Sequence, residues 1–282
     1  MASNEFRDDL GLHYSCRDAD SIERFNLALE SYLASRNDTM PALDELVARN
    51  EDMAMAHCFR GYLLKLASDP RFAQPIRDVL DRLGRQYDAL NNREKQHVDV
   101  LRAWTRNRTD EALQRAESLL VDYPRDMLAL RVAHYLHFYA GAAGDMRDSV
   151  SRSVAVWKPE EPFYGYLLGM LSFGLEEAGD YEGAERAGKQ AVELNPGDIW
   201  AAHAVTHVFQ MQHRFDEGIP WIEQLVPNWN RTNNFVYHLH WHKALLYLGL
   251  NRPDVALDIY DDLLEAPIAD DFYLDVCNAA SL

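Results

Sequence analysis

The sequence predicts an all-α protein built as a solenoid of paired helices. Three observations support this fold class. Apolar residues recur three and four positions apart, as at Leu168, Leu171 and Leu175. Alternating runs rich in valine, isoleucine and threonine are scarce. Turn signals such as Ala178-Gly179-Asp180 separate segments of helical length.

The helical segments repeat at a regular distance. Residues 165–196 predict one unit: a helix over Gly165–Glu177, a short turn, and a helix over Tyr181–Leu194, closed by Pro196. Small residues at 184 and 191 fit the second half of a tetratricopeptide repeat, whose period is about 34 residues. Matching landmarks are separated by 34, 38, 34 and 38 residues and place repeat starts near Arg93, Met127, Gly165, Ile199 and Tyr237.

Two earlier repeats complete the pattern, one starting near Met53 and one formed by Ile22–Leu33 with Pro41–Ala48. We therefore expect a tetratricopeptide-repeat α-solenoid with a right-handed superhelix, forming a single domain over residues 1–282.

One phrase recurs in phase with the repeats: Pro-Arg-Asp-Met-Leu-Ala, Pro-Gly-Asp-Ile-Trp-Ala and, more weakly, Asn-Glu-Asp-Met-Ala-Met. Aspartate is a preferred helix N-cap, so each of its aspartates is expected to cap the first helix of a repeat: Asp126, Asp198 and Asp52. Ser21 is expected to cap a helix that starts at Ile22.

Composition excludes several classes of function. The 282-residue chain carries 45 acidic and 28 basic residues, a net charge of −17, and such a chain repels nucleic-acid phosphates. Its three cysteines, Cys16, Cys58 and Cys277, form no CxxC, which suits a reducing compartment.

No segment approaches the roughly 20 apolar residues that span a bilayer. Without an N-terminal signal peptide, we expect a soluble, cytoplasmic protein with no membrane partner.

The repeat phase places histidines in the predicted groove. In a tetratricopeptide repeat, the second, fifth, sixth and ninth positions of the first helix face the concave surface. Six of the chain's 11 histidines fall on the groove-facing side: His57, His97, His203, His207, His238 and His242.

Four of these histidines form two H-x-x-x-H pairs, His203 with His207 and His238 with His242, on consecutive first helices. Both rings of such a pair point the same way, so one pair can chelate an ion. Neighbouring helices pack roughly 8–10 Å apart, which lets the second pair complete the site. We therefore predict a divalent transition metal, zinc or iron. The alternative is that these are partly buried, hydrogen-bonding helix histidines.

Other groove positions predict a ligand pocket. Glu94 and His97 are the candidate catalytic residues, with Glu94 as a carboxylate ligand or general base. The candidate ligand-binding residues are His57, Arg131, Tyr135, Tyr166, Phe173 and Trp241. The aromatic residues among them could equally fill the interior of the solenoid, and Arg131 could be internally salt-bridged.

Five motifs resemble one family. They are Arg93-Glu94-x-x-His97, Tyr123-Pro-x-Asp-Met-Leu-Ala-Leu, Met146-Arg-Asp-Ser-Val, Trp200-x-x-His203-x-x-x-His207-x-x-x-Met211 and His238-x-x-Trp241-His242-x-Ala244-Leu245. In order and spacing they resemble the tetratricopeptide repeat protein 38 family, from about His57 to Asp275. The resemblance implies a soluble, all-helical repeat protein with the six groove histidines at family-typical places, and it implies no established reaction. Family members usually continue beyond the point corresponding to Leu282, so we expect an exposed apolar end and self-association into a homo-oligomer.

Three functions compete at this point. The first is a histidine-rich pocket that binds a small molecule or metal ion, with a metal- or His/Glu-assisted hydrolase or lyase as its catalytic form. The second is an adaptor or scaffold that binds a peptide in the groove without catalysis. The third is a purely structural assembly protein.

Overall fold

The computed structural model describes residues 5–270 and 272–282, which fold into two compact units. Unit 1 comprises residues up to Tyr32 and Asp38–Tyr164, and unit 2 comprises Leu33–Asn37 and Gly165–Leu282. The predicted domain over 1–282 includes residues 1–4 and 271, which lie outside the described residues. That the two units form one continuous solenoid stays a prediction.

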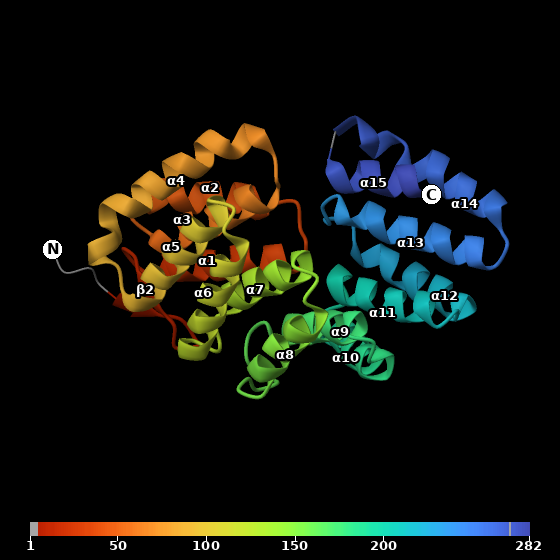
Figure 1. The fold of residues 1–282 in the computed structure, drawn as a ribbon, viewed down its shortest axis with the longest axis horizontal. Coiled ribbons are helices and arrows are strands. Elements are labelled where there is room, and N and C mark those ends of the chain that lie inside the picture. Colours follow the sequence, from red (N-terminus) through yellow and green to blue (C-terminus); the bar gives the residue numbers. More distant parts are fainter. Residues whose placement is uncertain (1–4, 271) are drawn as a thin grey trace. The chain divides into compact units, whose positions relative to one another are not determined.

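Unit 1 begins with a short hairpin followed by helices (Figure 1). Its elements are β1 (Glu5–Arg7), β2 (His13–Ser15), α1 (Ala19–Leu33), α2 (Thr39–Arg49), α3 (Ala54–Leu66), α4 (Ala73–Gln86), α5 (Asn92–Thr105), α6 (Thr109–Asp122), α7 (Met127–Tyr139) and α8 (Ala143–Val154), with 3₁₀ turns at Pro70–Phe72 and Tyr87–Ala89.

Among the described residues, the regular elements of unit 2 are helices, apart from an isolated antiparallel bridge between Arg36 and Thr232. Its elements are α9 (Tyr164–Glu177), α10 (Tyr181–Leu194), α11 (Ile199–Met211), α12 (Phe215–Leu225), α13 (Phe235–Gly249), α14 (Pro253–Ile259) and α15 (Tyr273–Ser281). Short 3₁₀ segments lie at Val226–Asn228 and Ala266–Asp270, and a π-helical segment at Tyr260–Leu264 continues α14.

The predicted fold class is confirmed: the chain is an all-α protein of tetratricopeptide-repeat type. Consecutive helices pack in pairs, α5 with α6, α7 with α8, α11 with α12 and α13 with α14. The predicted helix over Tyr181–Leu194 has those same bounds, and each of the five predicted repeat starts lies within two residues of the start of α5, α7, α9, α11 or α13.

Two of the three aspartates predicted to cap the first helix of a repeat do so. Oδ1 of Asp126 accepts a hydrogen bond from the Ala129 amide at 3.0 Å, and Oδ1 of Asp198 accepts one from the Ala201 amide at the same distance. The prediction for Asp52 is wrong, because Met53 holds the N-cap position of α3 and gives no side-chain cap.

The prediction for Ser21 is also wrong. Helix α1 starts at Ala19, so Ser21 lies in its first turn, and Asp18 accepts hydrogen bonds from the Ser21 amide and hydroxyl at 2.9 and 2.7 Å.

The hairpin β1–β2 was not expected from the sequence pattern. Its strands are only three residues long, too short to show alternation. Oδ1 of Asp8 organises the turn by accepting hydrogen bonds from the amides of Leu10 and Leu12 at 3.0 and 2.9 Å, and Gly11 has a φ of +78° that favours glycine. The buried Tyr14 ring then packs edge-on against Phe25, which attaches β2 to the helices of unit 1.

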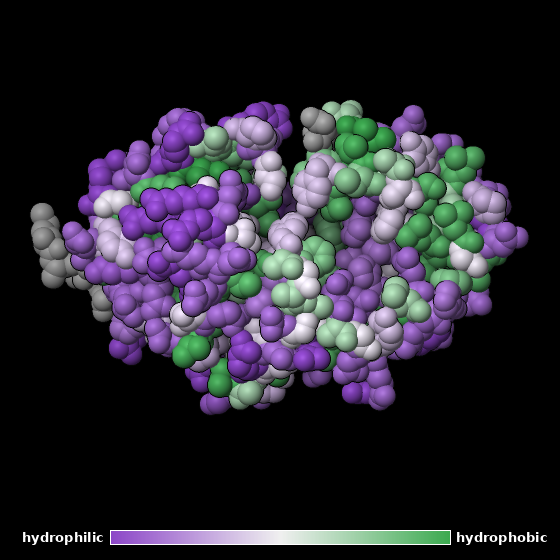
Figure 2. Space-filling view, viewed as in Figure 1, coloured by the Kyte–Doolittle hydropathy of each residue, from purple (hydrophilic) through white to green (hydrophobic). Residues whose placement is uncertain are grey.

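The surface differs between the units in the face that Figure 2 presents. Hydrophilic side chains cover most of unit 1, whereas hydrophobic side chains gather where α13 and α14 lie in unit 2. Leu248 on α13 and Leu257 on α14 are apolar side chains that are 39% and 59% exposed. None of the described helices has the length and apolar character needed to cross a bilayer.

Candidate metal centre

Four histidines from two neighbouring helices of unit 2 converge on one point. Helix α11 carries His203 and His207, and α13, which packs against it, carries His238 and His242. The two histidines of each pair lie four positions apart in the sequence, so both rings leave the same face of their helix. We call these four residues the histidine cluster.

The Nε2 atoms of the cluster lie close to one another. The distances from His242 Nε2 to the Nε2 atoms of His203, His207 and His238 are 3.1, 3.1 and 3.2 Å, and His203 Nε2 lies 3.0 Å from His238 Nε2. All four residues offer ring nitrogens within 4.8 Å of one another. A tetrahedral zinc ion with Zn–N distances of about 2.0–2.1 Å separates its ligand atoms by about 3.3 Å. The four separations given above are close to that spacing.

The outer nitrogens of three rings face oxygen acceptors. His207 Nδ1 donates to Glu176 on α9 at 3.1 Å, His238 Nδ1 to the Asn278 side-chain oxygen on α15 at 2.9 Å, and His242 Nδ1 to the Gln210 side-chain oxygen on α11 at 2.9 Å. These contacts assign the proton of each neutral ring to Nδ1, so that Nε2 presents a lone pair to the centre.

The fourth ring differs. His203 is 4% exposed, and among the described residues its Nδ1 has no hydrogen-bond partner. Phe173 stacks on it instead, with ring centroids 5.7 Å apart and an interplanar angle of 24°. Aromatic packing thus orients the one ring that lacks a polar contact at Nδ1.

Burial favours the uncharged form of His203, His238 and His242. Desolvation, followed by the neighbouring imidazoles, holds the pKa of His203 and His242 well below the ordinary value. Desolvation lowers the pKa of His238 to about 4, although the hydrogen bond to Asn278 acts in the opposite direction. Neutral imidazole is the form that binds metal ions. Lone pairs held about 3 Å apart repel one another, and a cation at their centre reverses that repulsion.

Aromatic side chains enclose the cluster. Trp241 stacks on His238, with ring centroids 5.3 Å apart and an interplanar angle of 12°. Phe235 lies edge-on to His203 at 5.1 Å, and Trp200 stacks on Phe235 at 5.4 Å. Apolar neighbours of this kind limit the access of water and strengthen the interaction between an ion and its ligands.

A second group of ligand atoms adjoins the cluster. Glu176, Glu177 and His207 each offer a donor atom within 4.8 Å of the others. Burial and the charge of Glu176 raise the pKa of Glu177. Because Glu176 is 6% exposed and already accepts the Nδ1 proton of His207, its geometry is that of a carboxylate that orients a ligand.

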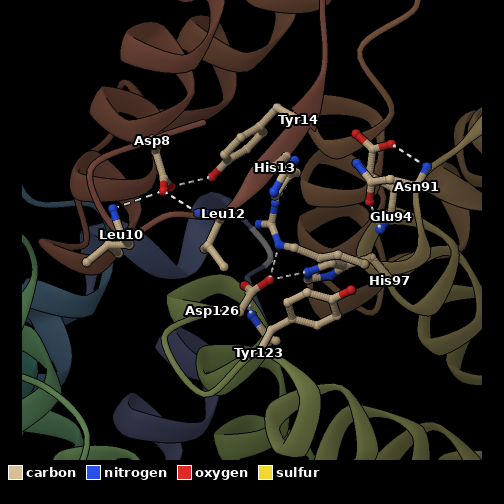
Figure 3. A network of polar contacts seen from close by, with 12 residues as sticks. Asp8, Leu10, Leu12, His13, Tyr14, Asn91, Glu94, His97, Tyr123 and Asp126 are labelled. Carbon is tan, nitrogen blue, oxygen red and sulfur yellow. Dashed lines mark hydrogen bonds and ion pairs between the residues drawn. The ribbon is translucent and has the colours of Figure 1, made fainter. Parts of the chain in front are cut away.

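The two predicted catalytic residues lie in unit 1, in a different polar network (Figure 3). Glu94 is fully buried; its carboxylate accepts from the Ser15 amide and hydroxyl, both at 2.7 Å, and from the Asn91 amide at 3.2 Å. His97 is also fully buried, and its Nε2 donates to Asp126 at 2.8 Å. These contacts attach β2 and cap α5, so the catalytic role predicted for Glu94 and His97 draws no support from the geometry.

The same network contains a buried ion pair. Nε of Arg93 lies 2.5 Å from Oδ2 of Asp126, and both side chains are 1% exposed. The guanidinium also donates to the His13 carbonyl at 3.0 Å and lies over the Tyr14 ring, 4.6 Å from its centroid. Arg93 and His97 hold the pKa of Asp126 far below its ordinary value against the opposing effect of burial. Arg93 and Asp126 are therefore counter-charges of each other, and Glu94 is compensated by hydrogen bonds.

The predicted ligand-binding residues divide between the units. Phe173 and Trp241 line the histidine cluster, and Tyr166 is 9% exposed on α9 of unit 2.

The others lie in unit 1. Nε2 of His57 lies 2.8 Å from the Glu51 carbonyl oxygen, and burial lowers the pKa of this ring. Arg131 donates to the Tyr135 hydroxyl at 3.0 Å and lies over that ring. A ligand role for these residues stays a prediction.

Several residues around the cluster were not predicted. Glu176, Gln210 and Asn278 contact the rings from 31, 32 and 40 positions away in the sequence. No short-range motif links such distant positions, so only the packing of α9 and α15 could reveal two of them. Trp200 and Phe235 lie at the starts of α11 and α13. The sequence shows that they are aromatic, but it does not show that Phe235 contacts Trp200 and His203.

The comparisons with known proteins support no transfer of function. The chain matches no known family model. Among solved structures it is similar to MamA, with 17% identity over 62% of this chain and 97% of that one at a TM-score of 0.47. The tetratricopeptide-repeat protein TTC0263 of Thermus thermophilus shares 22% identity over 65% of this chain and 96% of its own, at a TM-score of 0.48. A kinesin light chain-like repeat protein of Podosopora anserina shares 12% identity over 68% and 97%, at 0.49.

Proposed function

We propose that this protein is a metal-binding helical-repeat protein whose histidine cluster holds one divalent transition-metal ion. The observation that carries the proposal is the convergence of four Nε2 atoms: that of His242 lies 3.1–3.2 Å from the other three, and those of His203 and His238 lie 3.0 Å apart. Outer oxygen acceptors leave the Nε2 lone pairs of three rings directed inward, and low pKa values keep the buried rings neutral. Imidazole ligands suit zinc, copper, iron and nickel, and we favour zinc because it takes four ligands at about the separations found here.

The proposed role of the ion is structural. Four imidazoles complete a tetrahedral zinc site, whereas a catalytic zinc keeps one position for water or substrate. An ion at the cluster would join α11 to α13 and, through Glu176 and Asn278, would fix side chains on α9 and α15. Iron, the other metal predicted, accepts more ligands than four and would leave room for catalysis by a bound water.

Metal analysis of protein purified without a histidine tag tests the proposal. We expect one equivalent of zinc per chain, and loss of that equivalent in His203→Ala and His242→Ala. His213→Ala is the matched control, since that histidine lies in the turn after α11 and outside the cluster. A wild-type protein that neither retains nor takes up zinc, iron, copper or nickel after demetallation would refute it. One equivalent of iron would instead favour the catalytic form.

The second candidate is an adaptor that binds a peptide. Paired helices in tandem, the architecture that this chain adopts, form extended binding surfaces in repeat proteins. Exposed apolar side chains on α13 and α14, Leu248 and Leu257, favour contact with another protein. An affinity purification that recovers one partner from wild-type protein and loses it in Leu257→Asp would support this candidate. The two candidates are compatible, because the ion would stabilise the same helices.

A further inference from the structure

Helix α15 has the reverse of the usual amphipathic pattern. Its buried side chains are polar, Asp275 and Asn278, which are 2% and 3% exposed. Its apolar residues Tyr273 and Val276 are 48% and 37% exposed. A surface helix ordinarily buries its apolar face, and that burial holds it in place. Polar contacts must therefore contribute much of the attachment of α15.

Those polar contacts lead to the start of α13. Asn234, which precedes α13, donates from its side-chain nitrogen to Asp275 at 2.6 Å. His238, in the first turn of α13, donates from Nδ1 to Asn278 at 2.9 Å. At the end of the chain, Leu282 adds an apolar contact with the core of Ala244, Ala256, Ile259 and Leu264. One polar attachment of α15 thus passes through a member of the histidine cluster.

We propose that Asn278 is a positioning residue of the metal centre, so that metal binding and the docking of α15 stabilise each other. The inference rests on the proposed function. Asn278 accepts the Nδ1 proton, which keeps the Nε2 lone pair of His238 directed at the ion. An ion on Nε2 makes the Nδ1–H group more acidic and strengthens its hydrogen bond to Asn278. Because binding linkage is reciprocal, α15 raises metal affinity as much as the metal favours the docking of α15.

The first measurement is zinc affinity of the full chain, demetallated and titrated against a chromophoric zinc chelator. Asn278→Ala should weaken zinc binding about 10- to 100-fold, the usual effect of removing the outer partner of a histidine ligand. Asn278→Asp keeps an acceptor oxygen and should bind zinc at least as tightly as wild type. Val276→Ala is the matched control, since it changes an exposed side chain on the other face of α15.

The second measurement follows α15 itself. Cys277 is exposed on α15, whereas Cys16 and Cys58 are buried, so a thiol-reactive fluorophore labels this helix selectively. We expect the anisotropy of the label to rise when zinc is added to demetallated wild type. We also expect a smaller rise in Asn278→Ala and a full rise in Asn278→Asp.

The two proposals fail separately. If wild type binds zinc but Asn278→Ala binds it equally well and the label does not respond to zinc, the coupling is refuted while the metal centre stands. If wild type binds no metal, the metal centre is refuted and the coupling with it. If circular dichroism shows that Asn278→Ala does not fold, the zinc affinities of Asn278→Asp and Val276→Ala are compared instead. A zinc affinity of Asn278→Asp below that of Val276→Ala would refute the role of Asn278 as an acceptor.

Discussion

The two units each bury a group of polar side chains, but the groups differ in what they leave uncompensated. In unit 1, the positive charge of Arg93 faces the carboxylate of Asp126, and Glu94 receives three hydrogen bonds. In unit 2, three rings whose Nδ1 atoms face oxygen acceptors direct their Nε2 lone pairs at a common centre with His203 Nε2, at separations that include four of 3.0–3.2 Å. A network whose polar groups are paired within the chain stabilises a fold, whereas lone pairs that converge from several rings offer ligands to a cation. The comparison therefore directs the search for a bound ion to unit 2.

The largest expected effect concerns the network of unit 1. Arg93→Met leaves the buried carboxylate of Asp126 without its counter-charge, and breaking a buried pair in this way costs about 3–5 kcal/mol. We expect the free energy of unfolding in urea to fall by that amount. Arg186→Met is the control, because its pair with Glu182 is exposed. A loss below about 1 kcal/mol for Arg93→Met would mean that the network is not a stabilising one.

Zinc should produce the next largest effect, through the histidine cluster. At a free zinc concentration 100 times the dissociation constant, binding to the folded state alone adds about 2.7 kcal/mol to the free energy of unfolding. Urea titrations of demetallated protein with and without zinc measure this gain. His242→Ala should abolish it, and Arg93→Met should retain it. An equal gain in His242→Ala would show that zinc binds elsewhere.

Much of the fold was readable because its signals are local. Repeat starts, turn residues and the caps Asp126 and Asp198 all lie within a few positions of the helix ends that they define. The hairpin was missed because three-residue strands leave no period, and its attachment to Glu94 spans 79 positions.

The site was readable in part. The repeat phase brings His203, His207, His238 and His242 together, since the same phase fixes which face of α11 and α13 they occupy. It also selected His57 and His97, which occupy equivalent phases in unit 1 but have hydrogen-bond partners within the chain. The position of a residue in the repeat predicts only which face of the helix its side chain leaves. Whether a histidine meets a counter-group depends on distant packing, which a single sequence does not reveal.

A charge substitution next to the cluster sharpens the comparison further. Glu176→Gln retains an acceptor oxygen for His207 but removes the negative charge, so we expect zinc to bind about tenfold more weakly, or about 1.4 kcal/mol. Its neighbour Glu177→Gln is the control, since Glu177 is exposed. Competition titration measures both. Equal weakening in the two variants would indicate a general electrostatic effect on the ion, without a specific contribution from the hydrogen bond at Nδ1.

The smallest expected effect is the loss of stability in acid that is due to Asp126. Because its folded-state pKa lies below the ordinary value of 3.8, the folded protein keeps this carboxylate ionised when the unfolded chain takes up a proton. Its stabilising contribution is therefore complete above about pH 4 and falls as the pH drops below that value, by at most about 1.4 kcal/mol per pH unit. Urea unfolding of demetallated protein at pH 5, 4 and 3 measures the slope. Asp126→Asn has no proton to take up at this position. Its free energy of unfolding should therefore fall less steeply with decreasing pH than that of wild type, by at most about 1.4 kcal/mol per pH unit. Equal pH dependence in the two proteins would mean that the Arg93–Asp126 pair does not hold the carboxylate ionised.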